Sequence, residues 1–111
     1  MARQTYFPNR GDFVHLNFSP AAGHEQAGSR YGLVLSTASF ARVTGHALVC
    51  PITATVRNWP LEIRIPKGVL PPKQGIPVEG VILSYQVKSL DFRERNLSYV
   101  STAPDEILDE T

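Results

Sequence analysis

Glycine and proline divide this chain into short segments. Of its 111 residues, 8 are glycine and 9 are proline, and neither residue suits the interior of a long helix. Between them lie five to seven short apolar or alternating runs, separated by turn residues about every 8–12 positions. This pattern predicts a mainly β fold, a small antiparallel barrel or sandwich. We expect a single domain over residues 1–111, because domains usually hold about 100–150 residues.

Several runs show the patterns that are typical of strands. Residues 12–18 alternate, with Val14, Leu16 and Phe18 on one face and Phe13 on the other, which predicts a half-buried strand. Buried strands are predicted at the apolar runs 31–35 and 46–53. Further strands are expected at residues 59–65, 78–83, 85–90 and 97–100.

Three other segments lack a strand pattern. Residues 66–77 hold four prolines and two glycines, which predicts a surface loop. Residues 36–40 are expected to form one helical turn. A C-terminal helix is predicted to begin after Ser101 and Thr102, with a hydroxyl as the cap, Pro104 in the first turn, and Asp105 at the positive end of the helix dipole.

The charges are unevenly distributed along the chain. The formal net charge is only +1, which excludes a surface that is basic all over. Residues 1–100 nevertheless hold 11 basic and 6 acidic side chains, a net charge of +5, and residues 101–111 hold four acidic ones. The chain therefore has a mildly basic body and an acidic end, so a local basic groove remains compatible with these numbers.

Cysteine and hydropathy give an expectation for the compartment. With one cysteine, no intrachain disulfide can form. The first residues lead into no apolar segment of the kind found in signal peptides, and the longest apolar runs, around six residues, are far shorter than a membrane span. We expect a cytoplasmic protein without a membrane contact.

The usual signatures of metal and phosphate sites are missing from the sequence. His15, His24, His46 and Cys50 do not have the spacing of metal ligands, so we expect neither a metal nor another cofactor. Apolar neighbours predict that Cys50 is a buried, unreactive thiol. Gly23 and Gly28 are not followed by the Lys-Ser/Thr pair of a phosphate-binding loop.

Residues 23–30, between two predicted strands, place an imidazole, a carboxylate, an amide and a guanidinium within eight positions. Arginine suits phosphate binding, and histidine or glutamate can move a proton. From these residues alone, a functional loop and a solvated connection both remain open. Basic and aromatic residues also alternate near Trp59 and Phe92, although composition alone favours burial of both rings over a role at nucleic acid.

At this loop the sequence resembles the MazF/PemK family of toxin–antitoxin ribonucleases. The matching segments occur in order from about residue 8 to residue 108, nearly the whole chain. They are Gly11-Asp12 with the strand after it, Pro20, residues 23–30 (Gly-His-Glu-Gln-Ala-Gly-Ser-Arg), Leu33–Ser36, Cys50–Thr53, Trp59–Glu62, Gly80–Leu83 and Gln86–Arg93.

The resemblance implies a fold, an activity and partners. The fold would be a small SH3-like antiparallel barrel with short helices, and the protein a homodimer that binds RNA in a shared groove. The activity would be metal-independent, sequence-specific cleavage of single-stranded mRNA, which inhibits translation and growth. A cognate antitoxin would block the groove with an acidic, disordered C-terminal segment, and the toxin–antitoxin complex would bind operator DNA through the antitoxin.

The resemblance also assigns residues. Arg30 and Thr53 match the main catalytic pair of the family, which would stabilise the charge that builds up when the 2′-hydroxyl of the RNA attacks phosphorus. His24 and Glu25 match positions that handle protons or position the loop. The implied RNA-binding residues are Gln26, Ser29, Thr55, Arg57, Trp59, Tyr85, Gln86 and Lys88.

The sequence departs from the family at a few positions. Leu83 and Tyr85 stand where some members carry an Arg and an Asp that act as acid and base, so no Asp base is available there. Two alternatives to the enzyme remain. One is a toxin that acts by binding a protein, as does a gyrase-poisoning family with this fold, and the other is a nucleic-acid-binding barrel without activity.

Overall fold

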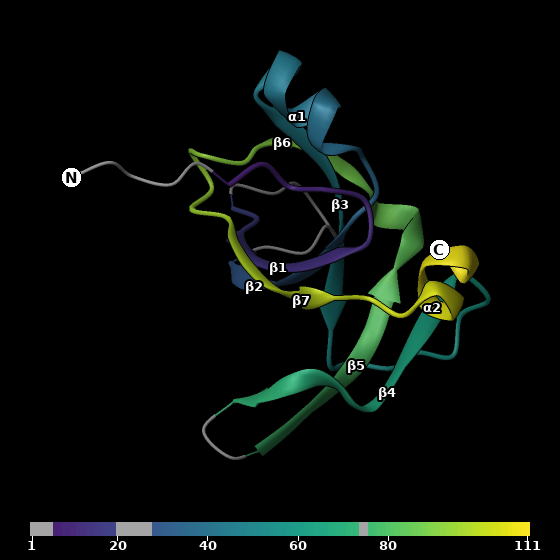
Figure 1. The fold of residues 1–111 in the computed structure, drawn as a ribbon. Helices are drawn as coiled ribbons and strands as arrows, with labels where there is room; N and C mark the ends of the chain where they lie inside the picture. The colour runs from purple at the N-terminus through teal and green to yellow at the C-terminus, as the bar shows by residue number, and fades with distance from the viewer. Residues whose placement is uncertain (1–5, 20–27, 74–75) are drawn as a thin grey trace.

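The computed structural model describes residues 6–19, 28–73 and 76–111 (Figure 1). In these residues the elements are β1 (Asp12–Asn17), β2 (Ser29–Val34), α1 (Ala38–Thr44), β3 (His46–Thr53), β4 (Glu62–Lys73), β5 (Ile76–Leu83), the 3-10 turn η1 (Ser84–Gln86), β6 (Lys88–Asp91), β7 (Ser98–Thr102) and α2 (Asp105–Glu110). Every strand pairing is antiparallel. The expectation of a mainly β, antiparallel fold with short helices is confirmed.

The strands form a curled sheet around β3. Their order is β4-β5-β3-β2-β1-β7, and β6 pairs with a separate stretch of β3. On one edge, β3 pairs through residues 46–49 with β6 and through Ile52 and Thr53 with β5. Pro51 lies between these stretches, where the pairing on that edge is interrupted and a proline is tolerated. Figure 1 shows the sheet curled into a half-barrel, with the β4–β5 hairpin extending away from it.

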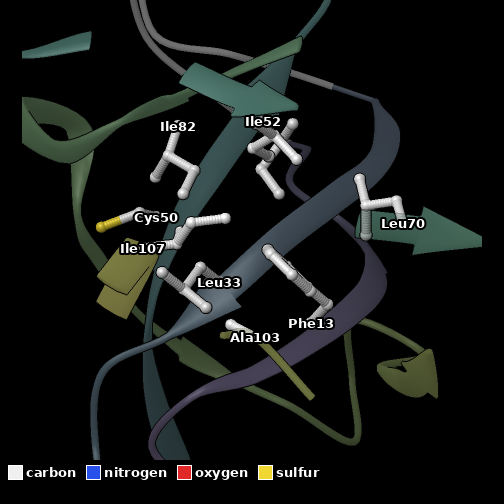
Figure 2. Close-up of a cluster of buried hydrophobic side chains, with 9 residues drawn as sticks. Phe13, Leu33, Cys50, Ile52, Leu70, Ile82, Ala103 and Ile107 are labelled. Carbon is white, nitrogen blue, oxygen red and sulfur yellow. The ribbon is translucent and has the colours of Figure 1, made fainter. Parts of the chain in front are cut away.

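Strand β1 contributes to two hydrophobic clusters. Val14, Leu16 and Phe18 pack together with residues of β2, β3 and β6, as the alternation predicts. Phe13 is also fully buried, in a second cluster whose members come from β1 to β5 and from the segment that leads into α2 (Figure 2). The prediction of a half-buried strand was therefore wrong at Phe13, because β4 and Ile107 of α2 cover its face of the sheet.

The proline-rich segment is not the predicted surface loop. Most of residues 66–77 belong to β4 and β5. Strand β4 is at the edge of the sheet, and an edge strand tolerates proline because one side of its backbone needs no partner. The register shifts between Ile65 and Leu70, around Gly68 with its φ of 89°, so a bulge takes up the irregular part of the sequence.

Both helices differ in detail from the expectation. Helix α1 spans Ala38–Thr44, so it begins two residues after the start of the predicted turn at residues 36–40 and continues four residues past its end; the Thr37 hydroxyl accepts a hydrogen bond from Phe40 N (3.2 Å) and caps it. Ser101 and Thr102 do not cap α2, since they pair with β1 as part of β7. Pro104 occupies the N-cap position without a side-chain hydrogen bond, and the acidic first turn is confirmed.

Two predicted strands begin later in the chain than their sequence patterns suggest. Residues 85–90 divide into η1 and β6, and β4 begins only at Glu62. Trp59 and Leu61 therefore precede the strand and are 51% and 55% exposed. Burial of Phe92 is confirmed, whereas burial of Trp59 in the core was wrong.

Candidate active site

The register of two central strands brings Arg30 and Thr53 to the same place. Strands β2 and β3 pair with Gly32 opposite Pro51, Leu33 opposite Cys50 and Val34 opposite Val49. The paired stretch ends at Gly32 and Pro51, so Arg30 and Thr53 lie two residues beyond it, at the same end of the two strands; there Arg30 pairs with Leu16 of β1 and Thr53 with Val81 of β5. Because side chains two residues apart in a strand point to the same face and residues opposite one another do so too, we expect the guanidinium and the hydroxyl on one face at this end.

Glycine allows β2 to lie close to β3 beside this pair. A Cβ added at Gly32 would lie 2.6 Å from Val49 Cγ1 and 3.1 Å from the Cys50 carbonyl oxygen. Any larger residue would separate the strands that hold Arg30 and Thr53. The close packing explains why glycine follows Tyr31 in this chain.

Thr53 is the last residue of β3 and is almost fully buried, at 7% exposed. Its hydroxyl oxygen accepts a hydrogen bond from Thr55 N at 3.2 Å. Because a hydroxyl has one hydrogen to donate in addition to its lone pairs, this contact leaves the donor available for a ligand. A Cβ at Gly80 would lie 2.5 Å from the Thr53 carbonyl oxygen, so only glycine lets β5 approach here.

The loop that follows β1 is closed at both of its ends. Phe18 N donates to the Gly28 carbonyl oxygen (2.9 Å), and Gly28 N donates to the Ser19 hydroxyl (2.7 Å). The Arg95 guanidinium donates to the Ser19 carbonyl oxygen. His24, Glu25 and Gln26 lie outside the described residues, so their predicted roles are not tested.

A second group of predicted residues surrounds the turn that enters β4. The Arg57 guanidinium lies 5.4 Å from the centre of the Trp59 ring, and the Trp59 and Tyr85 rings are 5.6 Å apart at an angle of 43°. Together with Pro60 and Leu61, these two rings line an open hollow of about 490 Å³. The structure therefore brings Arg57, Trp59 and Tyr85 together.

The remaining predicted RNA-binding residues are placed around these two groups. Ser29 and Thr55 are exposed next to Arg30 and Thr53, whereas Gln86 and Lys88 are half-buried in and after η1. Lys88 lies opposite Val49 in the β3–β6 pairing, four residues along β3 from Thr53. Lys88 is therefore not adjacent to the Arg30–Thr53 pair.

Sequence reasoning missed the residues that hold the second group in place. The Glu62 carboxylate accepts hydrogen bonds from Arg57 N and Asn58 N, both at 3.0 Å. Asn58 has a φ of 60°, a conformation that asparagine adopts more readily than most residues. The Ser84 hydroxyl donates to the Leu61 carbonyl oxygen at 2.7 Å. In the sequence, the signal for this turn was Asn58 followed four residues later by Glu62.

The remaining sequence predictions concern the Cys50 thiol, a metal site and a membrane span. Cys50 is buried, as expected, and burial raises the pKa of its thiol to about 11, which keeps it protonated and unreactive near neutral pH. In the described residues, no three His, Cys, Asp or Glu side chains gather as metal ligands would. Within the same residues, no helix has the length and apolar character needed to cross a membrane.

Known proteins resemble this chain over nearly its full length. The family model described as PemK-like, MazF-like toxin of type II toxin–antitoxin system matches residues 9–111. The chain is 35% identical over 103 residues to the endoribonuclease toxin MazF of Escherichia coli K12, covering 92% of this chain and 86% of that protein. It is 34% identical over 116 residues to the endoribonuclease toxin ChpB of the same organism, covering 99% and 91%.

Solved structures agree with this match. A crystal structure of MazF from Deinococcus radiodurans superimposes with a TM-score of 0.85 at 40% identity, covering 96% of this chain and 90% of that one. A MazE–MazF structure from the same organism gives 0.77 at 34% identity, covering 96% and 88%. The match over residues 9–111, the sequence identities and the shared fold show that the chain belongs to the PemK-like, MazF-like family of type II toxin–antitoxin toxins.

Proposed function

We propose that this chain is the toxin of a type II toxin–antitoxin system, an endoribonuclease that cleaves single-stranded mRNA at specific sequences and so inhibits translation and growth. The attacking group would be the 2′-hydroxyl of the RNA itself, and the products a 2′,3′-cyclic phosphate and a 5′-hydroxyl. The main support is that Arg30 and Thr53 lie at the same end of the neighbouring strands β2 and β3, two residues beyond the last pair, Gly32 and Pro51. Their side chains suit the stabilisation of a phosphorane, and this chemistry needs neither a metal ion nor a protein nucleophile.

Arg30 and Thr53 would share the added negative charge of the phosphorane. A guanidinium donates hydrogen bonds in a planar fork that fits two phosphate oxygens. The Thr53 hydroxyl, which accepts from Thr55 N, would donate its own hydrogen to a third oxygen. Donors fixed by the sheet before the reaction stabilise developing charge without reorganisation, and loss of one such donor typically lowers kcat by about 10²–10³.

Proton transfer must come from residues other than those at positions 83 and 85. Leu83 is fully buried and apolar, and Tyr85 packs against Trp59. We assign the proton transfers, or the positioning of the loop that makes them, to His24 and Glu25. In-line attack requires a splayed backbone, which accounts for a preference for single strands.

The partners follow from the same assignment. The similar structures from D. radiodurans include complexes of MazF with MazE, and we infer that an antitoxin with an acidic C-terminal segment blocks the groove of this chain. Two copies of the +5 body would give that groove a strong positive potential for RNA and for such a segment. We place the homodimer in the cytoplasm, where the toxin–antitoxin complex binds operator DNA through the antitoxin.

A single cleavage assay tests this function. Purified protein is incubated with a mixed-sequence RNA in EDTA, and the ends of the fragments are mapped. We expect cleavage in the chelator, only in unpaired regions, at a recurring short sequence, with cyclic phosphate and 5′-hydroxyl ends. Intact RNA, cleavage that requires added magnesium, or 5′-phosphate ends would contradict the proposal.

A further inference from the structure

We propose that the surface around α1 docks an acidic peptide segment of a partner protein, whose apolar side chains cover the helix and whose carboxylates pair with Arg42 and Arg93. This docking goes beyond the proposed cleavage of RNA, because it uses residues far from the Arg30–Thr53 pair. We call the surface the α1 corner. Its residues are Phe7, Phe40, Arg42, Val43 and Arg93.

Helix α1 presents apolar side chains to solvent. Ala41 is its one buried residue, and at about 100° per residue Val43 projects from the opposite face, with Phe40 and Arg42 on either side of it. Val43 is 85% exposed and Phe40 is 37% exposed. The outward face of a surface helix is normally polar, so the apolar outward face of α1 is typical of a site that a partner covers.

Two arginines from different elements meet beside this face. The Arg42 guanidinium lies 5.1 Å from the centre of the Phe7 ring, and the Arg93 guanidinium, from the turn after β6, lies 5.8 Å from the same centre. Arg93 also lies 5.4 Å from the centre of the Phe92 ring. Contact with a ring restricts these long side chains, so both guanidiniums are positioned before a ligand binds.

Neither guanidinium is neutralised by a carboxylate within the part of the chain that the structure describes. Helix α1 contains no acidic residue. In the turn that carries Arg93, the Asp91 carboxylate instead accepts hydrogen bonds from the backbone of Arg93 and Glu94, both at 3.1 Å. Two positive charges beside apolar surface are complementary to a ligand that is both acidic and apolar.

A peptide fits this surface better than RNA does. Single-stranded RNA is bound by bases that stack on open aromatic faces, but the Phe7 ring is half-buried, with two guanidiniums beside it and the edge of Phe92 against it. The side chain at the centre of the outward face is the aliphatic Val43. The apolar side chains of a peptide can cover it, and aspartate or glutamate can pair with a guanidinium through two parallel hydrogen bonds.

The α1 corner and the proposed reaction centre lie at opposite ends of β3. This strand begins at His46, directly after α1, and ends at Thr53, so the two sites are roughly 20 Å apart along it. Figure 1 shows α1 at one end of the molecule, away from the β4–β5 hairpin. A peptide at the corner therefore leaves Arg30 and Thr53 open, and the protein can hold its partner and RNA at the same time.

Fluorescence anisotropy tests the docking on the intact protein without RNA. The probe is a fluorescein-labelled peptide of about eight residues, which spans at most about 28 Å, with glutamate alternating with leucine or phenylalanine. Two control peptides carry glutamine at every glutamate position or serine at every apolar position. We expect the probe to bind with an affinity that falls as salt rises. Each control peptide should bind at least about 10-fold more weakly, because several contacts are lost at once.

Variants in the α1 corner identify where the peptide binds. Val43→Glu adds a like charge and should weaken binding by about 10-fold or more, with an unchanged thermal midpoint because the side chain is largely exposed. Arg42→Glu combined with Arg93→Glu should lose the acidic peptide and bind a version with lysine in place of glutamate, which a purely structural role of the arginines would not produce. Arg64→Ala, which removes an exposed arginine of β4, is the matched control and should bind normally.

Four results would overturn the proposal. The glutamine peptide could bind as tightly as the glutamate peptide, or Val43→Glu could bind the probe normally. The arginine variants could weaken binding of a 2′-O-methyl RNA strand instead of the peptide, which would make the corner an RNA surface. Val43→Glu could lower the mass of the protein in solution, which would show that a second copy of the chain covers the corner.

The docking test is independent of the proposed cleavage. Saturating peptide should leave the rate of RNA cleavage unchanged, and inhibition would contradict the placement of the peptide away from the reaction centre. Peptide binding without cleavage of RNA would refute the proposed enzyme and retain the docking surface. Cleavage without peptide binding would do the reverse.

Discussion

Two regions of the molecule hold the residues that we assign to RNA, and they are held in place by different forces. Arg30 and Thr53 lie where β2 and β3 end side by side, which we call the sheet end, and backbone pairing holds both: Arg30 pairs with Leu16 of β1, and the buried Thr53 pairs with Val81 of β5. Arg57 and Trp59 lie on an exposed turn that is held by one carboxylate, that of Glu62, and by one link to η1.

This difference matches what each region would have to do. Stabilising a phosphorane requires donors at fixed positions, because a small displacement of a catalytic group is costly. Stacking on a base tolerates small movements, since dispersion forces act over the whole face of a ring. The sheet end is therefore suited to the reaction and the turn to recognition, and variants in each region should affect different kinetic constants.

The largest effect is expected at Arg30. Arg30→Ala should lower kcat by about 10³-fold or more, because it removes the guanidinium that neutralises the phosphorane. A fluorogenic RNA assay under single-turnover conditions measures the loss, and the thermal midpoint should stay within a few degrees. Arg42→Ala, which removes an exposed arginine on α1, is the matched control. If Arg30→Ala cleaves at the normal rate, the sheet end is not the reaction centre.

A smaller effect is expected at Thr53. Thr53→Val keeps the shape of the side chain but loses the hydroxyl, and kcat should fall by about 10²-fold, as for the loss of one donor to an oxyanion. Thr53→Ser retains the hydroxyl and should recover most of the rate. The bond from Thr55 N is also lost in Thr53→Val, so unfolding should become easier by about 1 kcal/mol. Equal rates for the Val and Ser variants would show that the hydroxyl takes no part.

The sheet end could be predicted from the sequence more fully than the turn. Period-two alternation in β1 and the apolar run of β3 depend only on neighbouring residues, so both strands were found. The part of β4 after Ile65 was missed, because proline is tolerated there only by virtue of the edge position of the strand. Which strands pair with β3, and hence which edge is free, is set by contacts between residues far apart in the chain.

The candidate site divides in the same way. Arg30 and Thr53 were identified from motifs that resemble a known family, and the pairing of β2 with β3 then explains why two residues 23 positions apart lie at the same end of neighbouring strands. The role of Glu62 could not be predicted, because it depends on the positive φ of Asn58 and on two backbone donors that the turn brings together. The lack of a hydrogen-bond partner, among the described residues, for the buried Tyr85 hydroxyl likewise follows only from packing.

Weakening the turn should separate recognition from the reaction. Glu62→Ala removes the acceptor for Arg57 N and Asn58 N, so the turn that carries Arg57 and Trp59 should lose its fixed shape. We expect KM to rise by about 3- to 10-fold, the equivalent of one modest hydrogen bond, with kcat little changed. Asn58→Gly, which suits a positive φ, is the control and should leave KM nearly unchanged. A fall in kcat with constant KM would mean that the turn belongs to the reaction centre.

The smallest effect is expected at the acidic end. In α2, Ile107 is buried while Asp105, Glu106, Asp109 and Glu110 are all exposed, so the carboxylates face solvent. Changing these four to Asn or Gln removes four negative charges, yet we expect RNA affinity and its dependence on salt to stay within about two-fold, because the carboxylates face solvent and salt screens exposed charges over a Debye length of about 8 Å. Filter binding at several salt concentrations measures both quantities. A large gain in affinity would place α2 within the field of the RNA surface, and RNA recognition would then involve a third region besides the sheet end and the turn.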